Sequence, residues 1–202
     1  MKPWQRIVGA RPIGTGGPLP GLPDPGADSR GAFDELRRAL APALEHEPDS
    51  ALLSRGSLED VVGAFAVHAH QSRSALGLIA FELDDWKRVQ ESAGGEDFAR
   101  ALAGLGQELR RRVRASDELG RMGEAQIATV LPGCEEGSLD AVAHRLRGVL
   151  EARELTMPCE PCRPTFTTAW IAAPIGPVAA SSERLLGELA AALERARSSA
   201  AG

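Results

Sequence analysis

Two short stretches of the chain carry side chains of kinds that could bind ions or do chemistry. Residues 81–90 read FELDDWKRVQ and include Glu82, Asp84 and Lys87, and residues 113–133 read VRASDELGRMGEAQIATVLPG. Carboxylates that lie close together hold hard divalent cations. An arginine can form paired hydrogen bonds with a phosphate or with a base edge. Both stretches are therefore candidate sites, and their use depends on which side chains the fold brings together.

A third group is the pair Cys159 and Cys162, because Cys-x-x-Cys spacing can seat zinc or support thiol redox chemistry. A zinc site needs further ligands, which would have to come from Cys134 or from the histidines at 46, 68, 70 and 144. His68 and His70 fall two apart on a predicted helix, so they point to different faces and are poor joint ligands. We predict a structural or solvated role for these two histidines, and metal binding by the cysteine pair stays open.

The composition limits the class of protein. With 202 residues, of which 43% are hydrophobic, the chain can bury one ordinary core. A net charge of −5 argues against a surface that coats nucleic acid or an anionic membrane, so we expect neither as a partner. No window reaches the roughly 18 consecutive apolar residues of a membrane span, and the start lacks the apolar run of a signal peptide. We therefore predict a cytoplasmic protein without a disulfide framework.

Three segments follow from the pattern along the chain. Residues 1–30 hold six Pro and six Gly with few large apolar groups, which predicts a flexible arm. Residues 31–56 contain a short helix over 33–41, a candidate docking element, followed by a linker. The main domain is predicted to span residues 57–202.

Hydrophobic periodicity predicts the elements that must position the candidate sites. A helix begins at a capping box of Ser57 and Asp60, and a buried strand follows at residues 76–82. The clearest amphipathic helix ends around Arg114, before a hairpin whose two-residue turn is Gly123-Glu124, as in a type II′ turn. The remaining helix, strand and helix are predicted at 139–150, 165–173 and 185–193. A central antiparallel sheet of the ferredoxin-like or palm type, with helices packed on one face, satisfies this order and makes the fold α+β.

These landmarks resemble the GGDEF domain of diguanylate cyclases over residues 57–200. FELDDWKRVQ is similar to the family's first-strand motif D-x-D-x-F-K-x-I-N. SDELGRMGEAQIATVLPG is similar to its hairpin S-D-x-x-x-R-x-G-G-D-E-F-x-x-x-L-P-G, and AALERARSSAAG to its closing A-L-Y-x-A-K-x-x-G helix. Trp170 stands where the family usually has glycine. The resemblance implies a palm-like sheet with helices packed around it.

The resemblance also implies a site that makes cyclic di-GMP from two GTP molecules, and several residues depart from that site. Phosphoryl transfer needs divalent cations held by carboxylates, one on the first strand and one on the hairpin. Glu82 stands at the first position, but Ala125 cannot bind a metal, Gln126 is neutral, and Glu124 after Gly123 adds a negative charge near the triphosphate. We therefore predict a degenerate site with no cyclase activity, no metal and no cofactor. The other degenerate positions are Asp84, Lys87 and Gln90, the last in place of the family's guanine-contacting Asn.

Arg114 and Asp117 form an RxxD motif, and five residues separate Asp117 from Gly123. At this distance from the hairpin they resemble the family's inhibitory site, which binds cyclic di-GMP away from the catalytic residues. Arginine suits guanine O6 and N7 or a phosphate, and aspartate can accept from guanine N–H groups. Arg145 and Arg147 on the next helix are candidates for the additional arginine of such a site. We predict a cyclic di-GMP receptor in bacterial signalling that acts through a protein partner and that the ligand could join into a homodimer.

Two other functions stay open. The domain could be a ligand-independent protein-interaction scaffold derived from a cyclase, docking through the helix at 33–41 and the arm. It could instead bind GTP without turnover, with Lys87 and Arg197 meeting the phosphates. The RxxD motif also has a purely structural explanation, since cations are favoured in the last turns of a helix and Asp117 is an ordinary turn residue. Ligand binding would separate these interpretations.

Overall fold

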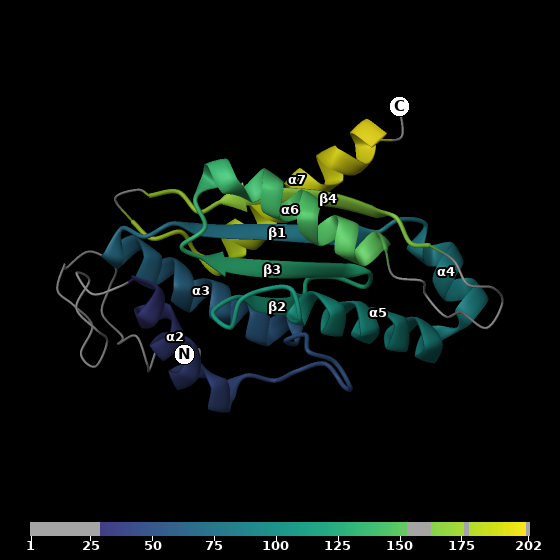
Figure 1. The fold of residues 1–202 in the computed structure, drawn as a ribbon, viewed down its shortest axis with the longest axis horizontal. Coiled ribbons are helices and arrows are strands. Elements are labelled where there is room, and N and C mark those ends of the chain that lie inside the picture. The colour runs from purple at the N-terminus through teal and green to yellow at the C-terminus, as the bar shows by residue number, and fades with distance from the viewer. Residues whose placement is uncertain (1–28, 153–162, 176–177, 201–202) are drawn as a thin grey trace.

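The computed structural model describes residues 29–152, 163–175 and 178–200 (Figure 1). Nearly all of the predicted arm, residues 1–30, lies outside the described residues, as do Cys159 and Cys162. Within the described part, no helix is both long enough and apolar enough to cross a membrane.

The predicted order of helices and strands is confirmed, with one helix added. The helices are α2 Ser29–Leu40, α3 Arg55–Ser72, α4 Trp86–Ala93, α5 Gly95–Arg110, α6 Glu136–Glu151 and α7 Ser182–Ala200, with a short 3-10 turn at Ala41–Ala43. The strands are β1 Leu76–Leu83, β2 Glu118–Arg121, β3 Gln126–Pro132 and β4 Phe166–Ala172. The sequence did not predict α4, which is only eight residues long and has no fully buried residue, so it leaves almost no periodic signal.

The four strands form one sheet in the order β2-β3-β1-β4, with every neighbouring pair antiparallel. β1 lies at the centre and is buried along its whole length, as its mainly apolar sequence, interrupted only by Glu82, predicted. Helices α5 and α6 cover one face, and α3 and α7 cover the other (Figure 1). The expectation that helices cover only one face was wrong, because the central strand carries apolar side chains on both faces and both must be kept from water.

Helix α2 lies outside α3 and belongs to the same core. Phe33 and Leu36 are fully buried and Leu40 is 1% exposed. The ring of Phe33 packs edge-on against Phe65 and His68 of α3, with centroid distances of 5.3 and 4.7 Å. The apolar face that we expected to dock onto a partner is therefore buried within the chain itself.

The segment predicted as a linker is also packed against the domain. Leu52 and Leu53 are both 1% exposed. The N–H of Leu53 donates to the carbonyl of Leu119 (2.8 Å), and its carbonyl accepts from the N–H of Arg121 (2.9 Å). These bonds form a parallel bridge between Leu53 and Gly120. The segment thus covers the outer edge of β2.

The first helix of the domain starts earlier than the capping box predicted. Ser54 is the N-cap of α3, and its side chain accepts from the N–H of Ser57 (3.3 Å). Ser57 lies inside the first turn, where its hydroxyl accepts from the N–H of Glu45 (2.7 Å). The predicted cap at Ser57 was therefore wrong by three residues, because a second serine stands in a better position.

Candidate functional site

The turn of the hairpin is shifted by one residue from the predicted one. β2 ends at Arg121 and β3 begins at Gln126, whose N–H approaches the carbonyl of Gly123 (3.5 Å). The two central residues are therefore Glu124 and Ala125. None of these turn residues has a positive φ, so the turn is not type II′. A Cβ at Gly123 would lie 2.6 Å from Oε1 of Gln126, so a side chain there would displace the Gln126 amide.

Ala125, which we expected to stand at the family's first hairpin carboxylate, presents a buried methyl group. Ala125 is 2% exposed and belongs to the core between the sheet and helices α5 and α6. Its carbonyl accepts from the N–H of Leu83 at the end of β1 (3.1 Å). Glu124 is exposed, and its carbonyl accepts from the guanidinium of Arg121 (2.7 Å). The turn is thus tied to β1 and to its own strand by backbone carbonyls.

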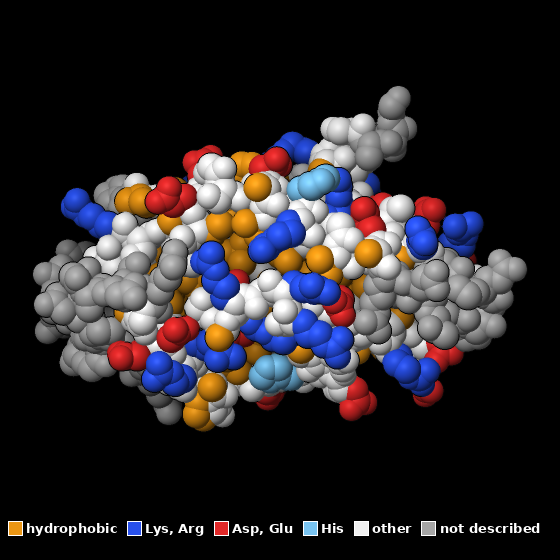
Figure 2. Space-filling view, in the orientation of Figure 1, with side chains coloured by type: hydrophobic (Ala, Val, Ile, Leu, Met, Phe, Trp, Pro, Cys, Tyr) orange, Lys and Arg blue, Asp and Glu red, His pale blue; other side chains and the backbone are white. Residues whose placement is uncertain are grey.

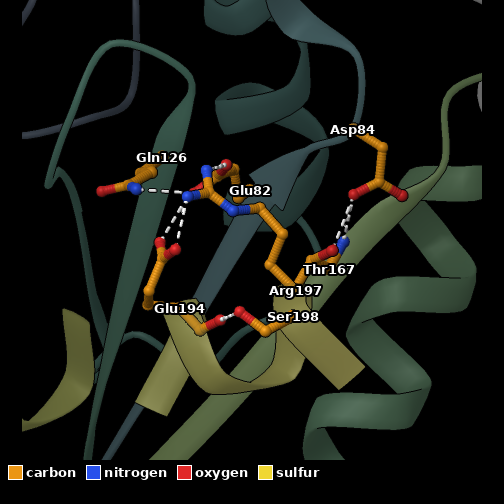
Figure 3. A network of polar contacts seen from close by, with 7 residues as sticks. All are labelled: Glu82, Asp84, Gln126, Thr167, Glu194, Arg197 and Ser198. Atoms are coloured by element: carbon orange, nitrogen blue, oxygen red, sulfur yellow. Dashed lines mark hydrogen bonds and ion pairs between the residues drawn. The ribbon is translucent and has the colours of Figure 1, made fainter. Parts of the chain in front are cut away.

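Glu82, near the end of β1, is the centre of a polar network (Figure 3). The strand register puts Glu82 opposite Gln126, whose Nε2 donates to Oε2 of Glu82 at 2.6 Å. Arg197 of α7 donates to Oε1 of Glu82 at 3.1 Å and pairs with Glu194 on the preceding turn of the same helix. The hydrogen bonds with Glu194 raise the pKa of Arg197. Glu82 is buried, and each of its carboxylate oxygens accepts a hydrogen bond from a protein side chain.

The other positions of the first-strand motif lie beside this network. Oδ1 of Asp84 accepts from the N–H and the hydroxyl of Thr167 (3.0 and 2.7 Å), which ties the start of β4 to the end of β1. Lys87 and Gln90 lie on α4; Lys87 is exposed and its Nζ lies 5.6 Å from the centroid of Trp86. The structure brings Glu82 and Gln126 together, whereas Asp84 bonds to Thr167 instead.

An open hollow of about 610 Å³ adjoins the network, between the end of β1, α4, β4 and α7. Its lining includes Glu82, Asp84, Lys87, Thr167 and Arg197.

In the part of the chain that the structure describes, no group of three or more His, Cys, Asp or Glu side chains could hold a metal ion. His68 is buried and packs against Phe33, and burial lowers its pKa, which agrees with a structural role.

Arg114 and Asp117 lie in the turn between α5 and β2. Helix α5 ends at Arg110, four residues before the predicted end. One carboxylate oxygen of Asp117 accepts from the N–H of Arg114 (2.8 Å), and the N–H of Asp117 donates to the carbonyl of Arg114 (3.2 Å). Burial raises the pKa of Asp117, and the hydrogen bond from Arg114 opposes that rise. Asp117 therefore closes the turn that presents Arg114.

Arg110 holds this turn from the inside, a role that the sequence pattern did not reveal. Its guanidinium donates to the carbonyl of Asp117 (2.6 Å) and to the carbonyl of Arg114. It also lies 3.9 Å from the carboxylate of Glu118, which pairs with Arg37 of α2. Burial lowers the pKa of Arg110 and raises that of Glu118, while the charges of the pair oppose both shifts. The turn is thereby connected to α2 through buried charges.

The RxxD hollow, lined by Arg114, Asp117 and Arg145, is shallow, with a volume of about 40 Å³. Arg114 and Arg145 are exposed, and neither guanidinium has a hydrogen bond or ion pair with another described residue. Figure 2 shows Lys and Arg side chains gathered over the face where α6, the hairpin and the end of α5 lie. Arg147 lines a separate hollow beside β4, so the structure brings Arg145, and not Arg147, to the motif.

A protein-family comparison agrees with the fold and with these landmarks. The model of the family described as diguanylate cyclase, GGDEF domain, matches residues 46–201. The chain belongs to this family. As a GGDEF domain it is part of cyclic di-GMP signalling, and its α+β fold is the one predicted from the sequence.

Similar proteins place this GGDEF domain among diguanylate cyclases of much greater length. It is 28% identical over 115 residues to the probable diguanylate cyclase DgcE of Escherichia coli, covering 55% of this chain and 10% of that one. It is 27% identical over 122 residues to the diguanylate cyclase DgcP of Pseudomonas aeruginosa, covering 59% and 17%. The chain thus spans less than a fifth of either relative.

The GGDEF domain of DgcB from Caulobacter crescentus, solved in complex with c-di-GMP, has the same fold. It superposes with a TM-score of 0.69 at 14% identity, covering 77% of this chain and 88% of that one. Identity this low shows the fold alone.

Proposed function

We propose that this GGDEF domain binds cyclic di-GMP through its RxxD motif and does not synthesise it. The observation that supports the proposal is the RxxD hollow: Arg114, Asp117 and Arg145, from the α5–β2 turn and from α6, line one site. The two guanidinium groups are exposed, and among the described residues a ligand would compete only with the longer-range attraction between Arg114 and Asp117.

The residue types match the chemistry of the ligand. Each guanidinium can donate two parallel hydrogen bonds to guanine O6 and N7 or to a phosphate. Oδ2 of Asp117 is bonded to the backbone of Arg114, while Oδ1 makes only a long contact of 3.5 Å with Ser116 and can accept from guanine N–H groups. Because the RxxD hollow holds only about 40 Å³, the ligand would lie on the surface and present base edges to it.

The local electrostatics favour an anion although the whole chain carries a net charge of −5. Exposed arginines at positions 111, 112, 114 and 145 lie at the end of α5 and on α6. Those at 111 and 112 pair with Glu108, whereas those at 114 and 145 line the RxxD hollow. A local positive patch of this kind attracts a ligand with two phosphates.

Three features of the hairpin and of the adjacent strand β1 support the absence of cyclase activity. Ala125 brings no side-chain oxygen, Gln126 is neutral, and the carboxylate of Glu82 is bonded to Gln126 and Arg197. A pair of divalent cations would have to displace Arg197 and would find one carboxylate where two are needed. The loss of metal-borne charge stabilisation costs several kcal/mol in the transition state, which leaves turnover negligible.

Calorimetric titration of cyclic di-GMP into the full chain tests the receptor role. Wild type should bind saturably, and Arg114→Ala and Arg145→Ala should each weaken binding by about tenfold or more, because each removes paired charge-assisted hydrogen bonds. Arg112→Ala is the matched control: it removes the same charge from a neighbouring position outside the RxxD hollow. It should leave affinity nearly unchanged.

A flat trace from folded wild type would contradict the receptor role and would leave the protein-interaction scaffold. Equal losses of affinity in all three variants would mean general charge attraction in place of a defined site.

The absence of cyclase activity is tested separately by incubating the chain with GTP and Mg²⁺ or Mn²⁺ and separating the nucleotides by chromatography. Formation of cyclic di-GMP would overturn that part of the proposal.

A further inference from the structure

A third hollow lies at the outer edge of β4, between α6 and α7. Its volume is about 320 Å³, much larger than that of the RxxD hollow. The polar or aromatic side chains that line this β4 hollow are Asp140, His144, Arg147, Thr168 and Trp170. The described residues thus give it a mixed lining of donors, one carboxylate and one large aromatic ring.

Two polar atoms in the β4 hollow are buried without a hydrogen bond. The hydroxyl oxygen of Thr168 and Nε of Arg147 have no hydrogen-bond partner among the described residues. Nε of Arg147 lies 3.6 Å from Glu151, within reach of its charge but beyond a hydrogen bond. Buried polar groups in native proteins nearly always find a partner. These two atoms lie just beneath the lining of the β4 hollow, where a small shift of the side chains would let a bound molecule supply the missing hydrogen bonds.

The neighbouring groups add directed hydrogen-bonding capacity. A terminal nitrogen of Arg147 lies 3.3 Å from Nδ1 of His144, and if Nδ1 accepts that bond, Nε2 of His144 is a donor. The indole N–H of Trp170 donates to Asp140 over a long 3.4 Å, so Asp140 retains capacity to accept from a ligand. Trp170 stands where the family usually has glycine, so this aromatic surface is a feature of this chain.

We propose that the β4 hollow binds a mononucleotide. The base would stack on Trp170 and donate from an amino group to Asp140, and the phosphate would be held by Arg147 and Thr168. The volume of about 320 Å³ lies at the small end of ligand pockets, which suits one nucleotide and not a cyclic dinucleotide.

The β4 hollow is independent of the proposed receptor site. Arg145 and Arg147 are two residues apart on α6, about 200° around the helix, and they line different hollows. Arg145→Ala is therefore a matched control: it removes an arginine from the same helix without touching the lining of the β4 hollow.

The test uses Trp170 as its own reporter. Replacing the other two tryptophans in the full chain (Trp4→Phe and Trp86→Phe) leaves a single indole, whose fluorescence is followed during titration with AMP, GMP, CMP and UMP. At least one nucleotide with an amino-bearing base (AMP, GMP or CMP) should quench it saturably below about 1 mM. Inorganic phosphate or the matching nucleoside alone should bind about tenfold more weakly or worse.

The variants decide whether binding occurs in the β4 hollow. Arg147→Ala and the isosteric Thr168→Val should each weaken the titration about tenfold, while Arg145→Ala should leave it unchanged. Circular dichroism checks that each variant is folded. No saturable change with any of the four nucleotides, UMP as the sole binder, or an equal loss in Arg145→Ala, would overturn the proposal. By calorimetry, Arg147→Ala should bind cyclic di-GMP with the affinity of wild type. The receptor proposal and the mononucleotide proposal can therefore be refuted separately.

Discussion

Removing the positive charge of Arg37 should destabilise the fold and strengthen its dependence on pH. Arg37 of α2 pairs with Glu118, whose side chain is only 7% exposed. Within the described residues the other ion pair of Glu118 is with Arg110, at 3.9 Å. The substitution Arg37→Met keeps most of the apolar stem and leaves a buried carboxylate with one distant cation.

The expected loss can be worked from these contacts. At an effective dielectric constant of about 20, an ion pair at ~4 Å has a gross attraction of about 4 kcal/mol. Water screens part of it because the side chain of Arg37 is 38% exposed, and Arg110 keeps part of the compensation. We expect the free energy of unfolding to fall by about 2 kcal/mol at neutral pH, or roughly 4–8 °C in melting temperature.

The pH dependence has a definite sign. Burial raises the pKa of Glu118 above its ordinary 4.5, so the folded state binds this proton more readily than the unfolded state. Its contribution to stability therefore falls as the pH rises from 4.5 through the raised pKa. Without Arg37 the pKa of Glu118 rises further, and the pH range over which its contribution to stability falls becomes wider. The free energy of unfolding of Arg37→Met should therefore fall furthest below that of wild type at neutral pH, and the difference should shrink on acidification toward pH 4.5.

Urea unfolding followed by circular dichroism, at neutral pH and at about pH 5, measures both effects. The matched control is Arg38→Met, which removes the same charge from the next, exposed position of α2. It should cost less than about 0.5 kcal/mol. A deficit that is equal in the two variants, or that does not change with pH, would refute the reasoning.

Three further substitutions test the packing. Phe33→Ala should cost about 3–5 kcal/mol and lower a single unfolding transition, because this fully buried ring joins α2 to the core; loss of a separate minor transition would contradict this. Gly120→Ala should cost about 1–3 kcal/mol, since its Cβ would lie 2.8 Å from Cβ of Leu58, and an unchanged urea midpoint would show that β2 can move away. Gly148→Ala, in α6 with nothing within 4 Å of the new Cβ, should instead raise stability by about 0.5–1 kcal/mol, measured by thermal melting.

The long periodic elements of the fold could be predicted from the sequence because their burial imposes a repeating pattern. β1 and α5 show this, the first as a run of apolar residues up to Glu82 and the second as an amphipathic stripe. The errors lie where the pattern is short. α4 has no fully buried residue, and the segment with Leu52 and Leu53 resembles a linker because its polar residues outnumber the two leucines, of which Leu52 lies beside Gly106 of α5 and Leu53 bonds to β2.

The candidate site was predictable only in its residue types. The spacing of Arg114 and Asp117 placed both in one turn, but nothing local indicates that Arg110 holds that turn or that Arg145 and Arg147 separate to different hollows. Those facts depend on how α5 and α6 pack on the sheet, which the sequence encodes only through contacts between distant positions.

The two edges of the sheet are not equally protected against adding strands from another molecule. The bridge between Leu53 and Gly120 blocks the outer side of β2, whereas β4 pairs only with β1 in the described part of the chain. The strand β4 reads FTTAWIA and contains neither a charged residue nor a proline, the usual devices that stop an edge from growing. Aggregation through sheet extension, when it occurs, should therefore begin on the β4 side, and a lysine introduced at an outward position of that strand should slow it.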